Sequence, residues 1–297
     1  MTVLTPLLRP GAATTDPLEV AVTAGAWRRL VARTDARIGL LLAGALVLVA
    51  LVGPLLTADP DVPQYTNQLQ PPGGGHLLGT DGAGRDLLAR TVAGARTSLG
   101  AALLITAITA VVGLLVGVVA GVAGDAVDVV LARIVDVLLG LPGLVLTLAL
   151  VGVLGPSFVN LVLAMSLTGW AGTARLARAY ACTSVTRPDV LAARMAGAGE
   201  LRIAAGHVLP GAAAQVLVVA TLGVGEVVLA LAGLSFLGLG AQPPTAEWGT
   251  MLAGARETLA YAPWQIIGPA TGLVATVLAA TLLSEALRDV TDPGVRS

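Results

Sequence analysis

The sequence predicts an all-α, polytopic membrane protein with six transmembrane helices. Hydrophobic residues make up 56% of its 297 residues and charged residues only 12%, with a mean hydropathy of +0.86. Soluble domains carry roughly 25% charged residues, so a single soluble core is excluded. Charge-free apolar runs long enough to cross a bilayer recur along the chain, and one polar stretch of two short helices separates the fourth span from the fifth.

Composition also limits the chemistry. The net charge of −1 gives no sign of a nucleic-acid partner, and Cys182 is the only cysteine, so no intramolecular disulfide can form. His76 and His207 fall in separate segments, and no Cys/His cluster predicts a metal site. All 17 basic residues are arginine, which excludes the lysine-containing phosphate-binding loop of ATPases. We therefore expect no catalytic residues, no metal and no cofactor bound by this chain.

The first span is expected at residues 38–58, a run without charge. Residues 1–37 are expected to form a cytoplasmic N-terminal segment, because they lack the early apolar core of a cleaved signal peptide. Their five arginines favour a cytoplasmic start for the helix, and Gly53-Pro54 is expected to kink or end it. Residues 59–96, rich in proline and glycine, are expected to be extracytoplasmic.

The second span is expected at residues 97–124, which contain no charge. Gly113, Gly117 and Gly121 recur every four residues there and so line one face of the helix. Small residues on one face allow the backbones of two membrane helices to approach closely. We predict that these glycines serve helix packing and do not line a pore.

The third and fourth spans are expected within one long apolar stretch. Residues 137–174 carry no charge over 38 positions, too many for a single helix. Gly155-Pro156 is the natural break, which gives spans at residues 134–154 and 157–179. Pro142 is expected to bend the earlier of these two spans.

The polar stretch from Pro188 to Pro210 is the longest interruption between apolar runs. Pro188 suits the first turn of a helix, and a turn at Gly197 and Gly199 separates that helix from a second one beginning at Glu200. Alanines leave one side of the first helix with little bulk. Two interpretations fit these residues: an amphipathic connector between spans, or a surface that another protein holds.

The fifth and sixth spans are expected at residues 212–237 and 258–284. Glu226 lies near the middle of the fifth, where an ionised carboxylate costs a few kcal/mol unless it is partnered or hydrated. It is expected to face a water-filled path or another helix. The alternative is a protonated side chain that has no role in function. Trp248 and Trp264, in the loop before the sixth span, are expected at the level of the lipid headgroups.

The arginines indicate the orientation of the chain. Thirteen of the 17 fall in segments expected inside, including the tail at residues 289–297. The four expected outside are Arg85, Arg90, Arg96 and Arg256. Because basic residues concentrate on the cytoplasmic side, six spans with both termini in the cytoplasm satisfy the distribution and the inverted topology does not.

Three segments of the sequence resemble one transporter family. Residues 187–210, with their alanine and glycine spacing and final His207-Val208-Leu209-Pro210, are similar to the "EAA" loop of binding-protein-dependent ABC importer permeases. Residues 76–86 and 234–244 resemble two segments of the oligopeptide/dipeptide/nickel permease family, in its C-type inner-membrane subunit.

Three positions depart from the family pattern. Leu191 stands where the family usually has an acidic residue before the alanine pair. Gly211 stands where an asparagine is common, and Leu77 replaces the usual proline.

The resemblance implies a permease subunit of an ABC importer in the bacterial cytoplasmic (inner) membrane, with a five-helix permease core at residues 97–288. Its implied solutes are dipeptides or oligopeptides, with nickel or another small solute as the alternative. The implied partners are a homologous second permease subunit, cytoplasmic ATPase subunits that use ATP and Mg²⁺, an extracytoplasmic solute-binding protein and the lipid bilayer.

The resemblance also assigns residues to sites. The loop would contact the ATPase as coupling helices through Asp189, Ala192, Ala193, Arg194, Gly197, Ala198, Glu200 and Arg202. An extracytoplasmic segment comprises Gly79, Thr80, Asp81, Gly84, Arg85 and Asp86, and we interpret it as an ordered cap over the pore in preference to a direct substrate contact. Family members commonly carry an acidic residue at the position of Leu231, which suggests that Glu226 replaces it.

Two other classes of function stay open. An ion-coupled secondary transporter normally has several intramembrane ionisable residues and internal repeats, whereas Glu226 stands nearly alone. A non-transporting scaffold or enzyme subunit has no positive support in the sequence. The preferred hypothesis is a transport subunit that works by alternating access, with ATP hydrolysis in a partner polypeptide.

Overall fold

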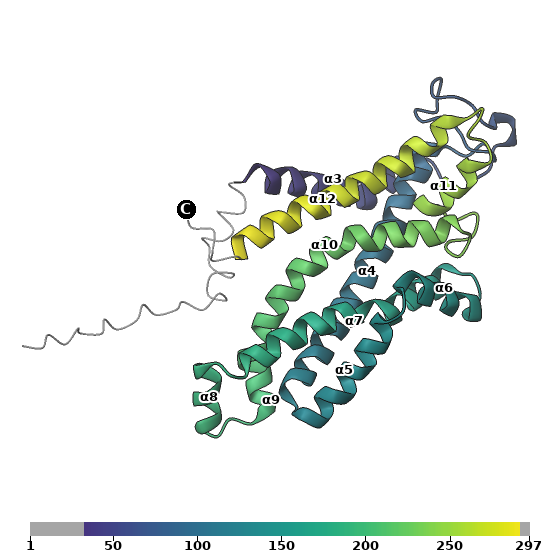
Figure 1. The fold of residues 1–297 in the computed structure, drawn as a ribbon. Coiled ribbons are helices and arrows are strands. Elements are labelled where there is room, and N and C mark those ends of the chain that lie inside the picture. Colours follow the sequence, from purple (N-terminus) through teal and green to yellow (C-terminus); the bar gives the residue numbers. More distant parts are fainter. Residues whose placement is uncertain (1–32, 292–297) are drawn as a thin grey trace, which may run out of the picture.

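The computed structural model describes residues 33–291, which form an elongated helical bundle without named strands (Figure 1). The predicted N-terminal segment and C-terminal tail fall largely outside these residues. The helices are α3 (Thr34–Leu56), α4 (Leu87–Val122), α5 (Asp125–Leu139), α6 (Gly143–Leu154), α7 (Phe158–Ser184), α8 (Pro188–Met195), α9 (Glu200–Ile203), α10 (Leu209–Phe236), α11 (Trp248–Arg256) and α12 (Ile267–Thr291). Short 3-10 turns lie at Tyr65–Asn67 and Pro263–Ile266, and a π-helical turn at Ala204–Val208.

Four helical stretches are long and apolar enough to cross a membrane: Thr34–Leu56, Leu87–Val122, Glu200–Phe236 and Pro263–Arg288. The bent pair α5–α6 adds a fifth if it is one span. Helix α7 is 27 residues long and carries arginines in its C-terminal half. The described residues thus confirm an all-α, polytopic architecture with four or five candidate spans, and the number six stays a prediction.

The second span begins ten residues earlier than predicted, at Leu87 instead of residue 97. The Asp86 side chain accepts a hydrogen bond of 2.8 Å from the backbone N–H of Ala89 and so caps the new helix start. Arg90, one turn further on, is only 5% exposed and is held by partners from other segments. The sequence prediction began this span after Arg96, the last charged residue before the apolar run. In the structure, Arg90 and Arg96 both lie within α4.

The third and sixth predicted spans need correction. Residues 134–154 do not form one helix, because α5 ends at Leu139, α6 begins at Gly143 and their axes differ by 86°. Pro142 lies at the break, where its ring prevents the helix from continuing. The helix predicted at residues 258–284 begins only at Ile267, because the preceding residues form turns and a short 3-10 helix.

Helices α4 and α7 pack closely along the glycine face that the sequence predicted. An added Cβ at Gly113 would lie 2.6 Å from the Thr173 Cβ, and one at Gly117 would lie 2.6 Å from the Ala177 Cβ. Both distances are far below an ordinary contact, so only glycine fits at these positions. The prediction of close helix contact is confirmed.

The prediction that Trp248 lies at the level of the lipid headgroups is wrong. Its side chain is 1% exposed and belongs to a core cluster. Its indole Nε1 donates a 3.0 Å hydrogen bond to the Thr91 carbonyl oxygen on α4. The preceding Glu247, 0% exposed, caps α11 through the N–H groups of Gly249 and Thr250, each at 2.8 Å. Because this buried cap seats the start of α11 against α4, the adjacent indole is directed into the bundle. Trp264 is half-buried against the same cluster.

Candidate functional site

Residues 187–210, the surface loop, lie at the opposite end of the bundle from α11 (Figure 1). The side chains of Val190, Ile203 and Val208 are completely buried. They form one apolar cluster with Val118 of α4 and Ala181 of α7. The surface loop is therefore anchored on the ends of the long helices, and a force applied to it reaches those helices through packed side chains.

A glycine turn joins α8 to α9, as the sequence predicted. Gly197 has a φ of +87°, in the left-handed region that favours glycine. The N–H of Ala198 donates to the Ala193 carbonyl oxygen at 3.0 Å, which closes the end of α8. The Arg194 guanidinium bonds both carboxylate oxygens of Glu200, at 3.0 and 2.9 Å, and so fastens the two helices together.

Three large apolar side chains project from the surface loop. Leu191 is 44% exposed, Met195 84% and Leu201 85%. Charged side chains of the predicted coupling set are exposed on the same loop, Asp189 and Arg202 among them. Of the other predicted residues, Ala192 is exposed, and Ala193 and Ala198 are half-buried. Large apolar side chains exposed on the same loop as charged ones are typical of a protein interaction surface.

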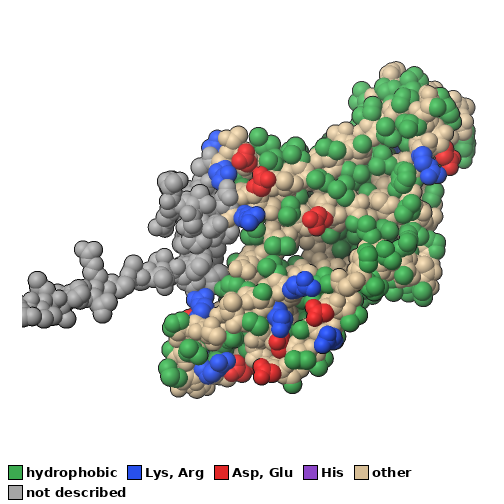
Figure 2. Space-filling view, viewed as in Figure 1, with side chains coloured by type: hydrophobic (Ala, Val, Ile, Leu, Met, Phe, Trp, Pro, Cys, Tyr) green, Lys and Arg blue, Asp and Glu red, His purple; other side chains and the backbone are tan. Residues whose placement is uncertain are grey.

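Charged side chains on the face drawn in Figure 2 gather mostly at the end of the bundle that holds α5, α8 and α9. Hydrophobic side chains cover much of the remainder of this face. The separation indicates that this end meets a polar environment while the middle of the bundle meets lipid or other membrane helices.

Residues 57–86, the cap, lie at the other end of the molecule. Asp81 organises its second half: the Asp81 carboxylate accepts from the N–H groups of Ala83 and Arg85 at 2.8 and 2.9 Å, and from Arg85 Nε at 2.8 Å. Thr80 is completely buried and its N–H donates to the Gln70 carbonyl oxygen at 3.0 Å. Bonds between its own residues therefore order this segment, with Asp81 paired to Arg85.

Glycines allow the cap to fold back on itself. Gly79 and Gly84 have φ values of +77° and +76°. A Cβ at Gly84 would overlap the carbonyl group of Gln64, and one at Gly79 would lie 2.9 Å from the Trp264 ring. Asp86, besides capping α4, pairs with His76 Nδ1 at 2.7 Å. The family segment is thus a folded unit whose side chains bond mainly to one another.

Arg90 is a structural residue that the sequence did not identify. It donates to the carbonyl oxygens of Pro60 at 3.0 Å and Pro244 at 3.1 Å, and its Nε lies 3.3 Å from the Asp81 carboxylate. These partners come from the cap and from the segment after α10. The only sequence signal was a charged residue near the start of a long apolar helix.

Glu226 lies on an exposed face of α10, ten residues before its C-terminal end. No hydrogen bond or ion pair holds its carboxylate within the described part of the chain. The structure therefore does not bring Glu226 together with the cap or with the surface loop.

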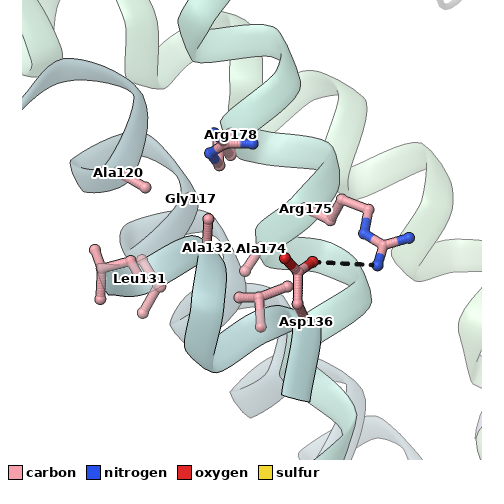
Figure 3. Close-up of a pocket in the computed structure, with 10 residues that line it drawn as sticks. Gly117, Ala120, Leu131, Ala132, Asp136, Ala174, Arg175 and Arg178 are labelled. Atoms are coloured by element: carbon pink, nitrogen blue, oxygen red, sulfur yellow. Dashed lines mark ion pairs between the residues drawn. The ribbon is translucent and has the colours of Figure 1, made fainter. Parts of the chain in front are cut away.

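A cavity of about 280 Å³ opens between α4, α5 and α7 (Figure 3). Gly117, Ala132 and Ala174 are among the small residues that leave it unfilled. Its charged groups are already paired: Asp136 lies 3.8 Å from Arg175, and Arg178 Nη2 lies 2.7 Å from Asp128. Over residues 33–291 no group of three or more His, Cys, Asp or Glu side chains is placed to hold a metal ion.

The comparisons with known proteins cover nearly the whole chain. Residues 113–297 match the family described as binding-protein-dependent transport system inner membrane component, and residues 23–72 match the N-terminal TM domain of oligopeptide transport permease C. The chain belongs to this permease family. It is 40% identical to the di/tripeptide transport system permease protein DppC of Pseudomonas aeruginosa, over 91% of this chain and 92% of the relative.

Other relatives align as completely. The dipeptide transport system permease protein DppC of Alkalihalophilus pseudofirmus is 34% identical over 98% of both chains. The nickel transport system permease protein NikC of Escherichia coli K12 is 37% identical over 89% of this chain and 96% of the relative.

Family membership confirms the predicted class of protein. This permease is a multi-pass inner-membrane component of an ABC importer, and it is a transport subunit and not an enzyme. As a member of a binding-protein-dependent system, it acts with a solute-binding protein and with a separate ATPase. The ion-coupled secondary transporter and the non-transporting scaffold are both excluded.

Proposed function

We propose that this permease imports dipeptides and short oligopeptides. The observation that carries the proposal is its end-to-end similarity to permeases named for di/tripeptide and dipeptide transport. Nickel is the second candidate solute, because the nickel permease of Escherichia coli aligns over a similar length.

The proposed membrane topology has six spans: α3, α4, the bent pair α5–α6, α7, α10 and α12. Both termini then lie in the cytoplasm, together with the surface loop, and the cap lies outside. The translocation path forms between this chain and a homologous second permease subunit. A partner ATPase supplies the energy from ATP and Mg²⁺, and the path opens alternately to each side.

The surface loop is the proposed coupling element. Leu191, Met195 and Leu201 would enter a cleft of the ATPase, with the charged side chains of the same loop fixing their orientation. Because Val190 and Ile203 pack on the ends of α4 and α7, closure of the ATPase would move these helices as a unit. The cap would cover the outer end of the path as an ordered lid.

The solute is tested by uptake of labelled dipeptide, oligopeptide and Ni²⁺ in cells with and without this chain, with the partner subunits present in both. We expect only peptide uptake to depend on the chain. Dependence of Ni²⁺ uptake alone would overturn the peptide proposal while leaving the transport class intact.

Substituting Gly197 with valine is expected to reduce peptide uptake at least ten-fold at unchanged membrane level. A β-branched residue at φ +87° is strained by about 1–2 kcal/mol, which would unfold the turn and misplace the apolar tips. An added Cβ meets no atom of residues 33–291 within 4 Å, so folding of the bundle should survive.

The matched control is Gly199→Val in the same turn, where φ is −72° and there is also open space. Copurification of the ATPase should fall in the Gly197 variant and persist in the control. Undiminished uptake by Gly197→Val at normal membrane levels would count against the coupling role.

A further inference from the structure

Helix α5 packs loosely on the bundle. Of its 15 residues only Val135 is buried, in a small cluster with Ala171 and Ala174 of α7. The cavity of Figure 3 separates much of α5 from α4 and α7, and Leu131 and Ala132 line it on the α5 side. Side chains beside a void have no partner atoms on that side, so apolar packing holds α5 only weakly.

An ion pair fastens the first turn of α5 to α7. The Arg178 guanidinium bonds both oxygens of the Asp128 carboxylate, through Nε and through Nη2, the latter at 2.7 Å. A two-point bond of this kind fixes orientation as well as distance. The pair of Arg175 with Asp136 is different, because it is 3.8 Å long, both side chains are 61% exposed and water screens it. We call Asp128 and Arg178 the clasp.

The clasp joins α5 to the part of α7 that carries the surface loop. Ala181, one turn after Arg178, is completely buried in the cluster that contains Val190 and Ile203 of the loop. The backbone at Arg178 also lies against α4, since a Cβ at Gly117 would be 2.7 Å from the Arg178 nitrogen. Arg178 therefore lies at a rigid point where α4, α7 and the surface loop meet.

The covalent connections of α5 provide no comparable link. Ala123 and Gly124 join it to α4, and Gly124 has a φ of +92° with no atom of residues 33–291 within 4 Å of an added Cβ. At the other end the chain changes direction by 86° at Pro142. Such element-terminal residues absorb changes in φ and ψ, so they pass little of a rotation of α4 on to α5.

We infer that Asp128 and Arg178 position α5 for transport, because the clasp makes α5 follow α4 and α7 when closure of the ATPase moves the surface loop. The inference rests on the proposed coupling role of that loop and adds the bond through which its movement reaches the bent pair α5–α6. Without the clasp, α4 and α7 would move while α5 stayed behind. ATP hydrolysis would then continue with little transport.

The clasp is tested by the ratio of dipeptide imported to ATP hydrolysed, measured on the assembled transporter in vesicles with its solute-binding protein. Asp128→Asn and Arg178→Gln each remove the ionic bond and should lower this ratio roughly five-fold, with ATP hydrolysis retained. The double variant Asp128→Arg with Arg178→Asp exchanges the two charges and should recover most of the ratio. Asp136→Asn breaks the long, exposed pair on the same helix and is the matched control, with an unchanged ratio.

Two results of this experiment would overturn the inference. An unchanged ratio in both single variants would mean that α5 follows α7 without the clasp. A ratio no higher in the charge-exchanged variant than in the single variants would mean that the two side chains act separately.

A distance between two spin labels tests the movement itself and needs no solute. Cys182 on α7 is exposed and takes one label, and Val130→Cys on α5, at a side chain 59% exposed, takes the other. With the other cysteines of the transporter replaced, the distance should be the same with and without ATP and vanadate while the clasp is intact. It should change with ATP and vanadate in Asp128→Asn. A change with the clasp intact, or none in the variant, would overturn the inference, and the first of these is decided even if the variants assemble poorly.

The clasp and the proposed function fail separately. If Asp128→Asn keeps the normal ratio while Gly197→Val loses uptake, the clasp is wrong and the coupling role of the surface loop stands. If Gly197→Val keeps its uptake, the coupling role of the loop is wrong. If the wild-type transporter imports no dipeptide, the solute is wrong, and the spin-label distance still decides whether the clasp holds α5 to α7.

Discussion

Gly117→Leu is expected to prevent α4 and α7 from packing, and so to remove most folded protein from the membrane. A Cβ at this position would overlap the Ala174 carbonyl oxygen and lie 2.7 Å from the Arg178 backbone nitrogen. Backbone atoms of a long helix cannot move aside as a flexible side chain can. The two helices must therefore separate, at a cost of about 3 kcal/mol or more.

The control for this variant is Gly100→Leu on the same helix. Gly100 is exposed and has open space around it, so leucine should be tolerated and slightly favour the helix. The measurement is the amount of monodisperse protein recovered in mild detergent. Similar recovery of both variants would show that the close contact of α4 with α7 is not needed for folding.

Arg90→Met is expected to release the cap from the bundle. Methionine retains much of the apolar stem but leaves the carbonyl oxygens of Pro60 and Pro244 without their donor. Removal of one partner from a buried ionic cluster costs on the order of 3 kcal/mol. For a chain of this size the thermal midpoint of the solubilised protein should fall by roughly 5 °C.

Arg96→Met is the matched substitution, because Arg96 lies on the same helix but is exposed. It should leave the thermal midpoint unchanged. Limited proteolysis should cut residues 57–86 faster in the Arg90 variant and at the normal rate in the Arg96 variant. Equal midpoints and equal cleavage rates would mean that the cap is held without Arg90.

Several features were predictable from the sequence because they depend on local chemistry. The long apolar runs predicted membrane helices, since only such runs satisfy both lipid and the backbone. The positions of Gly113 and Gly117 predicted a close helix contact, and Gly197 and Gly199 predicted a turn, which the structure shows to be left-handed at Gly197. Residues 76–86, 187–210 and 234–244 predicted the family, which the comparisons confirm.

Other features depended on contacts between distant segments. The burial of Arg90, in the first turn of α4, follows from partners 30 and 154 residues away along the chain. Trp248 is buried because the Glu247 cap seats it against α4. The bend between α5 and α6 was expected at Pro142, but its 86° change of direction was not.

The sequence by itself determined the membrane character, the approximate spans and the family of this permease, because apolar length and local motifs carry that information. Only the tertiary structure decided which apolar residues face the bundle and which face outward. Lipid and a protein interior are equally apolar, so hydrophobicity does not distinguish Val228 in the core from Leu229 on the exposed face of α10. Only the structure places Glu226 on that outward face of α10, away from the buried side chains of the same helix.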